Sequence, residues 1–206
     1  MRCVLPALRL ARRVAAVAAV AAVAIAGALP VSAQAQGVIP GPARVETDPQ
    51  RRQAERDAAF AALAAATNET AARMATGIMW RAFMLAPDTR AADLMNRAVR
   101  AHSAFSLDRA MVHLDALIAH APGWAEGWNQ RAFVHFLAAR YERSVADCAE
   151  ALAREPRHLG CMTGMARIYT RHLRHRRRAL ELLDAATALN RWVAERRLYE
   201  ELVAPE

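Results

Sequence analysis

A spacing of 34 residues recurs through the middle of the chain. Pro122 and Pro156 stand at this distance, and Leu94, Trp128 and Met162 follow one another at the same step. Further columns with this step are Ala98, Ala132 and Ala166; Arg97 and Arg131; Ala110 and Ser144; and Leu117, Ala151 and Ala185. Agreement among independent columns is hard to obtain by chance, even in an alanine-rich chain. The period predicts an array of similar units, each burying its apolar face against its neighbours.

Each unit is expected to be helical. From Pro49 to Val203 the chain consists largely of Ala, Leu, Arg and Glu, with apolar residues three and four positions apart. That spacing places them on one face of an α-helix. No alternating run of β-branched residues is long enough to indicate a strand. The predicted fold class is therefore all-α.

The best copy of the unit covers residues 125–158 and reads AEGWNQRAFVHFLAARYERSVADCAEALAREPRH. It resembles the tetratricopeptide repeat (TPR), a helix-turn-helix unit that stacks into a solenoid. The positions that carry the resemblance are one large, three small and one turn residue: Trp128, Ala132, Ser144, Ala151 and Pro156. Small side chains let two helices cross closely, and a proline ends the second helix. We also expect Asp147 to pair with Arg131 on the facing helix.

The resemblance implies about three repeats with capping helices. Residues 91–124 form a looser copy through Leu94, Ala98, Ala110 and Pro122, and residues 159–191 form another through Met162, Ala166 and Tyr169. The latter fits only if one residue is inserted within TRHLRHRRR, residues 170–178. Residues 48–90 are predicted to form two helices, as a degenerate repeat or a cap, and residues 192–206 a C-terminal capping helix and tail. Asp48 followed by Pro49 is a typical helix start.

The N-terminus has the pattern of an export signal. Four arginines within residues 1–13 precede an uncharged apolar run, residues 14–29, and Ala33-Gln34-Ala35 offers small residues for cleavage after Ala35. A retained membrane anchor, a core helix and twin-arginine export are the alternatives. Residues 1–35 are thus predicted to be a signal peptide and residues 36–47 a flexible leader, which places the mature protein in the periplasm or outside the cell.

Charge narrows the choice of partner. The chain has 28 arginines, no lysine and 20 acids. Removal of four signal arginines lowers the net charge from +8 to +4, an ordinary value for a small domain. The run at residues 170–178 holds five arginines but no aromatic residue for base stacking. Nucleic-acid binding is therefore not expected, whereas an acidic protein or an anionic membrane surface stays open as its partner.

Enzymatic signatures are missing from the sequence. It contains no glycine-rich phosphate loop, no G-x-S-x-G, no H-E-x-x-H and no C-x-x-C. His172 and His175 could share a helix face, but a specific metal site normally needs three or four ligands. Cys148 and Cys161 form either a disulfide or two small buried residues. We expect no catalysis, no cofactor and no metal.

The TPR resemblance implies a ligand groove lined by the first helix of each repeat. The positions carried over are Met95, Val99, His102 and Ser103; Asn129, Phe133, Phe136 and Leu137; and Thr163, Arg167, Thr170 and Arg171. An amide, two phenyl rings and two arginines suit an extended peptide with an acidic group. The two rings could instead be covered by the capping helices.

The predicted function is a non-catalytic periplasmic scaffold that binds a protein or peptide. One alternative is a structural adaptor that docks into an envelope complex through its basic outer surface. The other is a metal or redox accessory protein using the histidines and the cysteine pair.

Overall fold

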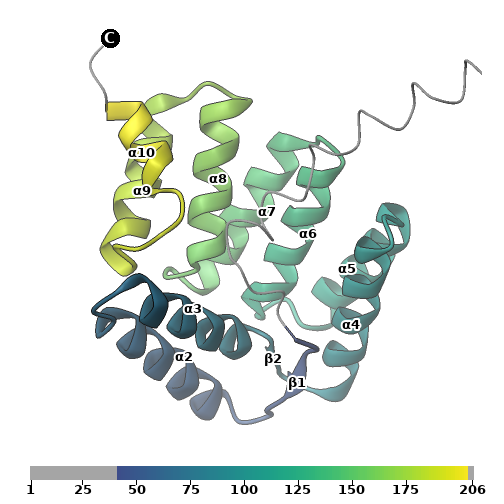
Figure 1. Cartoon of the computed structure of the whole chain (residues 1–206). Coiled ribbons are helices and arrows are strands. Elements are labelled where there is room, and N and C mark those ends of the chain that lie inside the picture. Colours follow the sequence, from purple (N-terminus) through teal and green to yellow (C-terminus); the bar gives the residue numbers. More distant parts are fainter. Residues whose placement is uncertain (1–40, 204–206) are drawn as a thin grey trace, which may run out of the picture.

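The computed structural model describes residues 41–203 (Figure 1). This part of the chain folds into nine α-helices and two short strands. The helices are α2 (Pro49–Ala64), α3 (Glu69–Phe83), α4 (Thr89–Ser103), α5 (Leu107–His120), α6 (Ala125–Leu137), α7 (Tyr141–Arg154), α8 (Leu159–Arg171), α9 (Arg176–Leu189) and α10 (Arg196–Val203). The strands are β1 (Arg44–Val45) and β2 (Leu85–Ala86). The predicted all-α solenoid is confirmed. None of the described helices is long and apolar enough to cross a membrane. The predicted signal peptide, residues 1–35, lies outside the described residues.

Polar caps start the first three helices. The side chain of Asp48 accepts a hydrogen bond from the backbone of Gln50, with Pro49 in the first turn of α2. Asn68 caps α3 through Ala71, and Asp88 caps α4 in the same way. These bonds satisfy backbone N–H groups that have no partner within the helix. The helix start predicted at Asp48-Pro49 is confirmed.

The pairs α4–α5, α6–α7 and α8–α9 are the three predicted repeats, stacked side by side (Figure 1). Their small residues lie at the helix crossings, where Ala98, Ala110, Ala132, Ala151 and Ala166 are at most 1% exposed. Ser144, 2% exposed, donates its hydroxyl hydrogen to the carbonyl oxygen of Ala132 at 2.8 Å. This bond lets a polar residue occupy a position that elsewhere holds alanine.

The turn within each repeat contains one residue in the left-handed region. Phe105, Ala139 and Arg174 have φ values of 55°, 55° and 53°. Residues 104–106 and 138–140 join the first two pairs, whereas residues 172–175 join α8 to α9. The third turn is thus one residue longer. The predicted insertion within residues 170–178 is located there.

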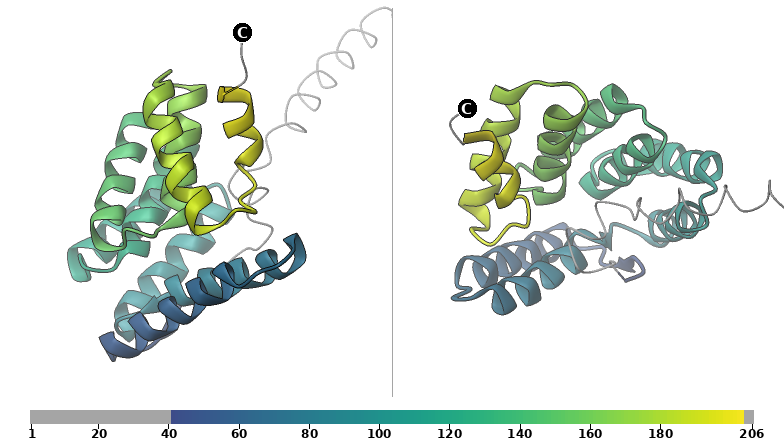
Figure 2. Two further views of the ribbon diagram at one scale, coloured as in Figure 1. Left: turned by 90° about the vertical axis from the view of Figure 1, so that its left-hand side faces the viewer. Right: turned by 45° about the horizontal axis from the view of Figure 1, so that its top comes forward.

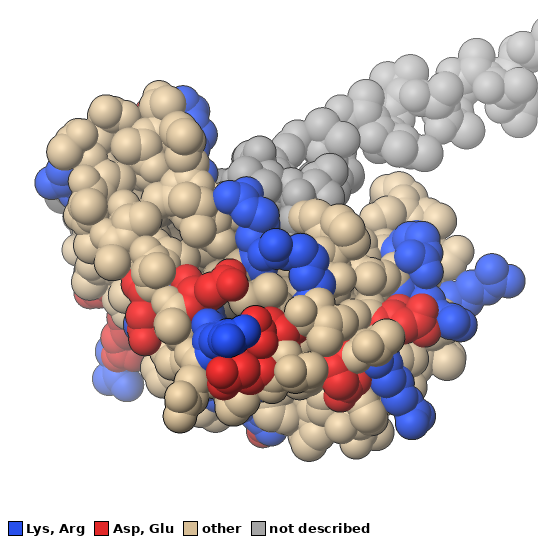
Figure 3. Space-filling view, turned by 90° about the horizontal axis from the view of Figure 1, so that it is seen from below, with Lys and Arg blue, Asp and Glu red and all other residues tan. Residues whose placement is uncertain are grey.

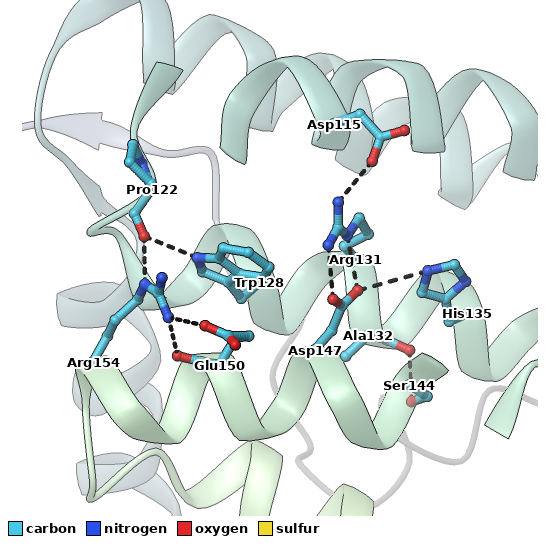
Figure 4. A network of polar contacts seen from close by, with 10 residues as sticks. All are labelled: Asp115, Pro122, Trp128, Arg131, Ala132, His135, Ser144, Asp147, Glu150 and Arg154. Atoms are coloured by element: carbon cyan, nitrogen blue, oxygen red, sulfur yellow. Dashed lines mark hydrogen bonds and ion pairs between the residues drawn. The ribbon is translucent and has the colours of Figure 1, made fainter. Parts of the chain in front are cut away.

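Polar contacts tie the second repeat to the first (Figure 4). The Arg131 guanidinium on α6 donates to both carboxylate oxygens of Asp147 on α7, each at 2.8 Å, and to Asp115 on α5 at 2.8 Å. Charged hydrogen bonds of this bidentate form are among the stronger polar contacts in proteins. The expected pairing of Asp147 with Arg131 is confirmed, and Asp115 extends it to the preceding repeat.

Trp128 fills the gap between the ends of two repeats (Figure 4). Its indole N–H donates to the carbonyl oxygen of Pro122 at 2.9 Å, and the Arg154 guanidinium lies 4.5 Å from the ring centroid. Arg154 also donates to the Pro122 carbonyl. One proline carbonyl therefore receives donors from two helices of the next repeat.

The N-terminal pair α2–α3 does not stack beneath α4–α5 as a further repeat. The core cluster around its Phe60 and Trp80 includes Leu159 and Met162 of α8 and Ala186 of α9, and no residue of α4 or α5 among those described. Figure 2 shows the pair lying beside the arc of α4 to α9, close to α9 at one end. The chain thus folds back on itself, and its first helices cover the third repeat. The N-terminal pair therefore caps the solenoid at its third repeat and not at its first.

The structure also corrects part of the predicted flexible leader. Arg44 and Val45 of β1 pair in parallel with Leu85 and Ala86 of β2. The backbone N–H groups of Arg44 and Glu46 donate to the carbonyl oxygens of Met84 and Ala86 at 3.2 and 3.0 Å. Two residues per strand are too few to leave an alternating pattern in the sequence. Residues 36–40 of the predicted leader lie outside the described residues.

Candidate functional site

The predicted groove residues come from α4, α6 and α8, and we call the side of these helices that carries them the inner face. Contacts link it from repeat to repeat. The rings of His102 and Phe133 meet edge to face at 5.4 Å between centroids, and those of Phe136 and His172 lie 6.3 Å apart. These contacts bring His102 and Phe133 together and place Phe136 beside His172. The structure shows which of them are open.

The end of the inner face next to α3 is covered by that helix. Trp80 of α3 lies against Gly160, where an added Cβ would be 2.4 Å from the ring atom Cη2. Phe83 stacks on the His158 ring, with centroids 4.4 Å apart and an interplanar angle of 9°. The indole N–H of Trp124 donates to the carbonyl oxygen of Phe83 at 2.9 Å. Glycine at position 160 is what allows this close approach of two helices.

A buried polar cluster lies below this contact. Glu126, 1% exposed, accepts hydrogen bonds from the side-chain amides of Asn129 at 3.0 Å and Gln130 at 2.7 Å. Its other oxygen lies 3.1 Å from Nε2 of His158, which is fully buried. Nδ1 of His158 accepts the backbone N–H of Cys161 at 3.3 Å, so the ring proton is on Nε2 and points to Glu126. The cluster holds α6 to the start of α8, and Phe83 at the end of α3 stacks on its imidazole ring.

Asn129 therefore differs from its predicted role. Its NH₂ group donates to Glu126, and its carbonyl oxygen lies 3.3 Å from Sγ of Cys161, which donates to it. An amide engaged on both sides is not available to hold the backbone of a peptide. Asn96 on α4 instead binds a main chain, that of Ala43 in the same protein. Its Oδ1 accepts the backbone N–H of Ala43 at 2.8 Å, and its Nδ2 donates to the Ala43 carbonyl at 3.5 Å.

Met95 also departs from the prediction, because it is fully buried in the core around α4 and α5. A residue buried this deeply contributes to packing and does not contact a ligand. Thr163 is likewise buried, at 4% exposure. The carried-over position directly after the large residue is thus buried on both the first and the third repeat.

The C-terminal segment occupies the two predicted groove arginines. Arg167 donates to Glu195 at 2.5 Å, and Arg171 donates to Glu201 at 3.2 Å. α10 packs Leu198 against Ala166 and Leu183 beside them. The predicted acid-binding role of these arginines is therefore filled by acids of the same chain.

What stays open is an aromatic strip, which we define as His102, Phe133, Phe136, Tyr141 and His172. Phe133 and Phe136 are half-buried, as are Val99 and His102. Tyr141 stacks on His172 at 3.8 Å between centroids, with an interplanar angle of 14°. Burial lowers the pKa of His102. The strip is an aromatic surface without a carboxylate or a guanidinium of its own.

The two cysteines are free and buried. Of the two alternatives offered by the sequence, the structure has the second, two small buried side chains. Burial, together with a hydrogen bond between the two thiols, raises the pKa of Cys161 well above its ordinary value. A thiol held in its protonated form is a poor nucleophile and a poor metal ligand. No group of three or more metal-ligating side chains occurs among residues 41–203.

A cavity of about 340 Å³ lies on another side of the molecule, between α2 and the turns that join successive repeats. Its lining includes Arg52, Arg56, Trp124 and Glu155, and none of the predicted groove residues. The Arg56 guanidinium lies 3.1 Å from Glu155. Seen from below, arginines and acids are interleaved over this side (Figure 3). The cavity is walled by charges that already pair with one another.

Comparison with known proteins agrees with this fold. A TPR repeat-containing protein of Rhizobium etli is 44% identical over 59 residues, which are 29% of this chain and 29% of that protein. Most of the length of that relative is thus unmatched. Among solved structures, the TPR2B domain of yeast Sti1, in its complex with pHsp70, superposes with a TM-score of 0.51. The match has 21% identity and covers 56% of this chain and 94% of that domain. No protein-family model matches the chain.

These findings define the class of the protein. Its fold is a tetratricopeptide-repeat solenoid, and the resemblance noted on residues 125–158 is confirmed.

Proposed function

We propose that the protein is a non-catalytic periplasmic scaffold that binds a protein or an extended peptide on its inner face. The periplasmic location rests on the signal pattern of residues 1–35. The binding role rests on the TPR fold and on the surface described above. The yeast domain that shares this fold was solved in complex with a partner, pHsp70.

The observation that carries the proposal is the way Asn96 of α4 and the strand β2 hold residues 43–46 of the same chain. This segment is extended, pairs with β2 and receives both hydrogen bonds of the Asn96 amide. A main chain bound by strand pairing and by one amide is the mode in which many domains hold peptides, with neighbouring side chains supplying specificity. The aromatic strip provides those side chains here, because Phe133 and Phe136 leave part of their rings in solvent.

Two acids of the C-terminal segment limit access to the arginines of the inner face. Glu195 and Glu201 occupy Arg167 and Arg171, so an acidic partner must displace the C-terminal segment to reach them. An apolar partner segment needs no such change. We therefore place the primary contact on the aromatic strip, and contact with the two arginines only in a complex in which α10 has moved.

The test is affinity capture from an envelope extract, with chemical cross-linking and mass spectrometry. Phe133→Ala should lower recovery of the cross-linked partner at least tenfold. Val112→Ala, at a side chain 67% exposed on α5, is the matched control and should leave recovery unchanged. If Phe133→Ala has no effect while Arg174→Glu abolishes capture, the partner docks through the basic outer surface, and the adaptor function replaces the groove.

A further inference from the structure

The three turns that join the first to the second helix of each repeat lie on one side of the molecule, the upper side in Figure 1. We call this side the turn edge and define it as residues 103–109, 138–143 and 172–178. It shares Tyr141 and His172 with the aromatic strip, but Phe105 and the arginines that carry the inference are not part of that strip. Two features of the turn edge are unfavourable for folding, and both are exposed.

The first unfavourable feature is Phe105. Its φ of 55° is left-handed, a conformation that glycine adopts freely and an aromatic residue adopts only at a cost. Its side chain is 76% exposed, so packing gives little in return. A strained, exposed aromatic residue indicates a functional reason for its presence.

The second unfavourable feature is the start of α9. Its first turn holds Arg176, Arg177 and Arg178 and no acid, although the positive end of the helix dipole disfavours cations there. The Arg177 side chain is 91% exposed and meets only Glu181, four residues later, in the weaker of the two orientations of such a pair. The helix would be more stable with acids at these positions.

The charge of the turn edge is mainly positive, because it holds seven arginines and only two acids, Asp108 and Glu142. Arg140, Arg143 and Arg174 are exposed, and the described residues provide none of them with an ion pair. Seen from below, on the opposite side, arginines alternate with acids (Figure 3). Elsewhere in the fold arginines are paired, as Arg157 is with Asp57 and Arg56 with Glu155. The turn edge thus combines a positive net charge with a protruding phenyl ring.

We propose that the turn edge binds the anionic headgroups of a lipid bilayer, with the ring of Phe105 entering the interface and the arginines around the turns contacting phosphates. Exposed arginines and a protruding aromatic ring are what peripheral proteins present to such a surface. The arginines stand on three separate turn tips and form no pocket with Phe105. A fluid layer of headgroups can adapt to that spacing, whereas an acidic protein would need a matching rigid surface.

The experiment is vesicle sedimentation with the chain from Gln36 to Glu206. Every core cluster consists of residues between Ala43 and Leu202, so this chain keeps its whole core. It also lacks the apolar run of residues 14–29, which would bind vesicles by itself. Vesicles of phosphatidylcholine with phosphatidylglycerol should retain the protein, vesicles of phosphatidylcholine alone should not, and salt should weaken the retention.

Two variants test the edge itself. Replacement of Arg140, Arg143, Arg174 and Arg177 by serine should lower the partition coefficient roughly fivefold for each arginine removed. The control variant replaces four arginines elsewhere by serine and so changes the net charge by the same amount. Their side chains are 54–75% exposed, and they are Arg51, Arg73, Arg97 and Arg196. Equal losses in both variants would overturn the proposal, because attraction would then follow net charge alone.

Phe105→Gly gives a readout that a structural role would not give. It should weaken vesicle binding at least threefold and yet raise the melting temperature by about 2–4 °C, since glycine relieves the left-handed strain. Unchanged vesicle binding by this variant would overturn the role of the ring. Absence of binding to anionic vesicles by the parent chain would overturn the whole proposal and leave an acidic protein as the partner of the edge.

Discussion

Gly160→Ala is the sharpest perturbation of the contact between α3 and the inner face. The new Cβ would lie 2.4 Å from Cη2 and 3.2 Å from Cζ2 of Trp80. The nearer distance is about 1 Å shorter than an ordinary contact between carbon atoms. Trp80 is 3% exposed within the core cluster, so its rigid ring has little room to move. Overpacking of this kind costs about 1–3 kcal/mol.

The matched control is Gly164→Ala, one turn further along α8. An added Cβ there meets nothing within 4 Å. Alanine is a better helix former than glycine by up to about 1 kcal/mol, so this variant should be more stable than the parent. We expect the two variants to differ by about 1–3 kcal/mol in free energy of unfolding, measured by urea denaturation with circular dichroism at unchanged slope.

A second substitution locates the cause. In a Trp80→Leu background the ring tip is gone, so Gly160→Ala should lose its cost even though the background itself is less stable. If Gly160→Ala and Gly164→Ala stabilise the protein equally, Trp80 does not lie against α8. The position assigned to the N-terminal pair would then be wrong.

Three further predictions concern the polar groups. Arg131→Ala should lower the free energy of unfolding by about 2–4 kcal/mol, because Asp147, 6% exposed, loses its charged partner; a urea titration showing a loss under about 0.5 kcal/mol would contradict the network. Burial lowers the pKa of His102 and of His135, so the unfolded chain binds more protons than the folded one once the pH falls below about 6.5. Stability should therefore be complete above that pH and decline as the pH falls from about 6.5 toward the lower folded-state values, and His102→Asn should flatten the decline; equal slopes would exclude His102 as its source. Cys148 and Cys161 should react with a thiol reagent only after unfolding, and a failure to react even then would indicate a disulfide.

The repeats were predictable because their signal is periodic. Trp128, Ala132 and Ser144 recur in kind at a fixed step, and each has a local steric reason that does not depend on the rest of the fold. The pairing of Arg131 with Asp147 followed from the same reasoning, since both lie within one repeat. The extra residue before α9 was visible as a break in that period.

The placement of α2 and α3 was not predictable in this way. It depends on Trp80 meeting Gly160 and on Phe83 meeting His158, contacts between a segment outside the repeats and the third repeat. Neither pair has a spacing that marks it in the sequence. A glycine near the start of α8, where a helix former is expected, was the one local sign that another helix comes close.

Part of the candidate site was predictable from the repeat pattern, and part of it was not. Phe133 and Phe136 follow from the position of α6 in its repeat, and they lie on the inner face. Arg167 and Arg171 also lie there, but their partners are acids of the C-terminal segment, which the repeat pattern does not describe. Asn96 was missed because its role depends on residues 43–46, assigned to a flexible leader.

Site-specific photo-cross-linking in intact cells tests the central claim most directly. A photoreactive phenylalanine analogue at position 136 should form a defined adduct with a protein of the periplasm, and the same analogue at position 112 on α5 should form none. The adduct should disappear when Phe133 is changed to Ala in the same chain. Adducts of the same mass from positions 136 and 112, or none from position 136, would contradict binding on the inner face.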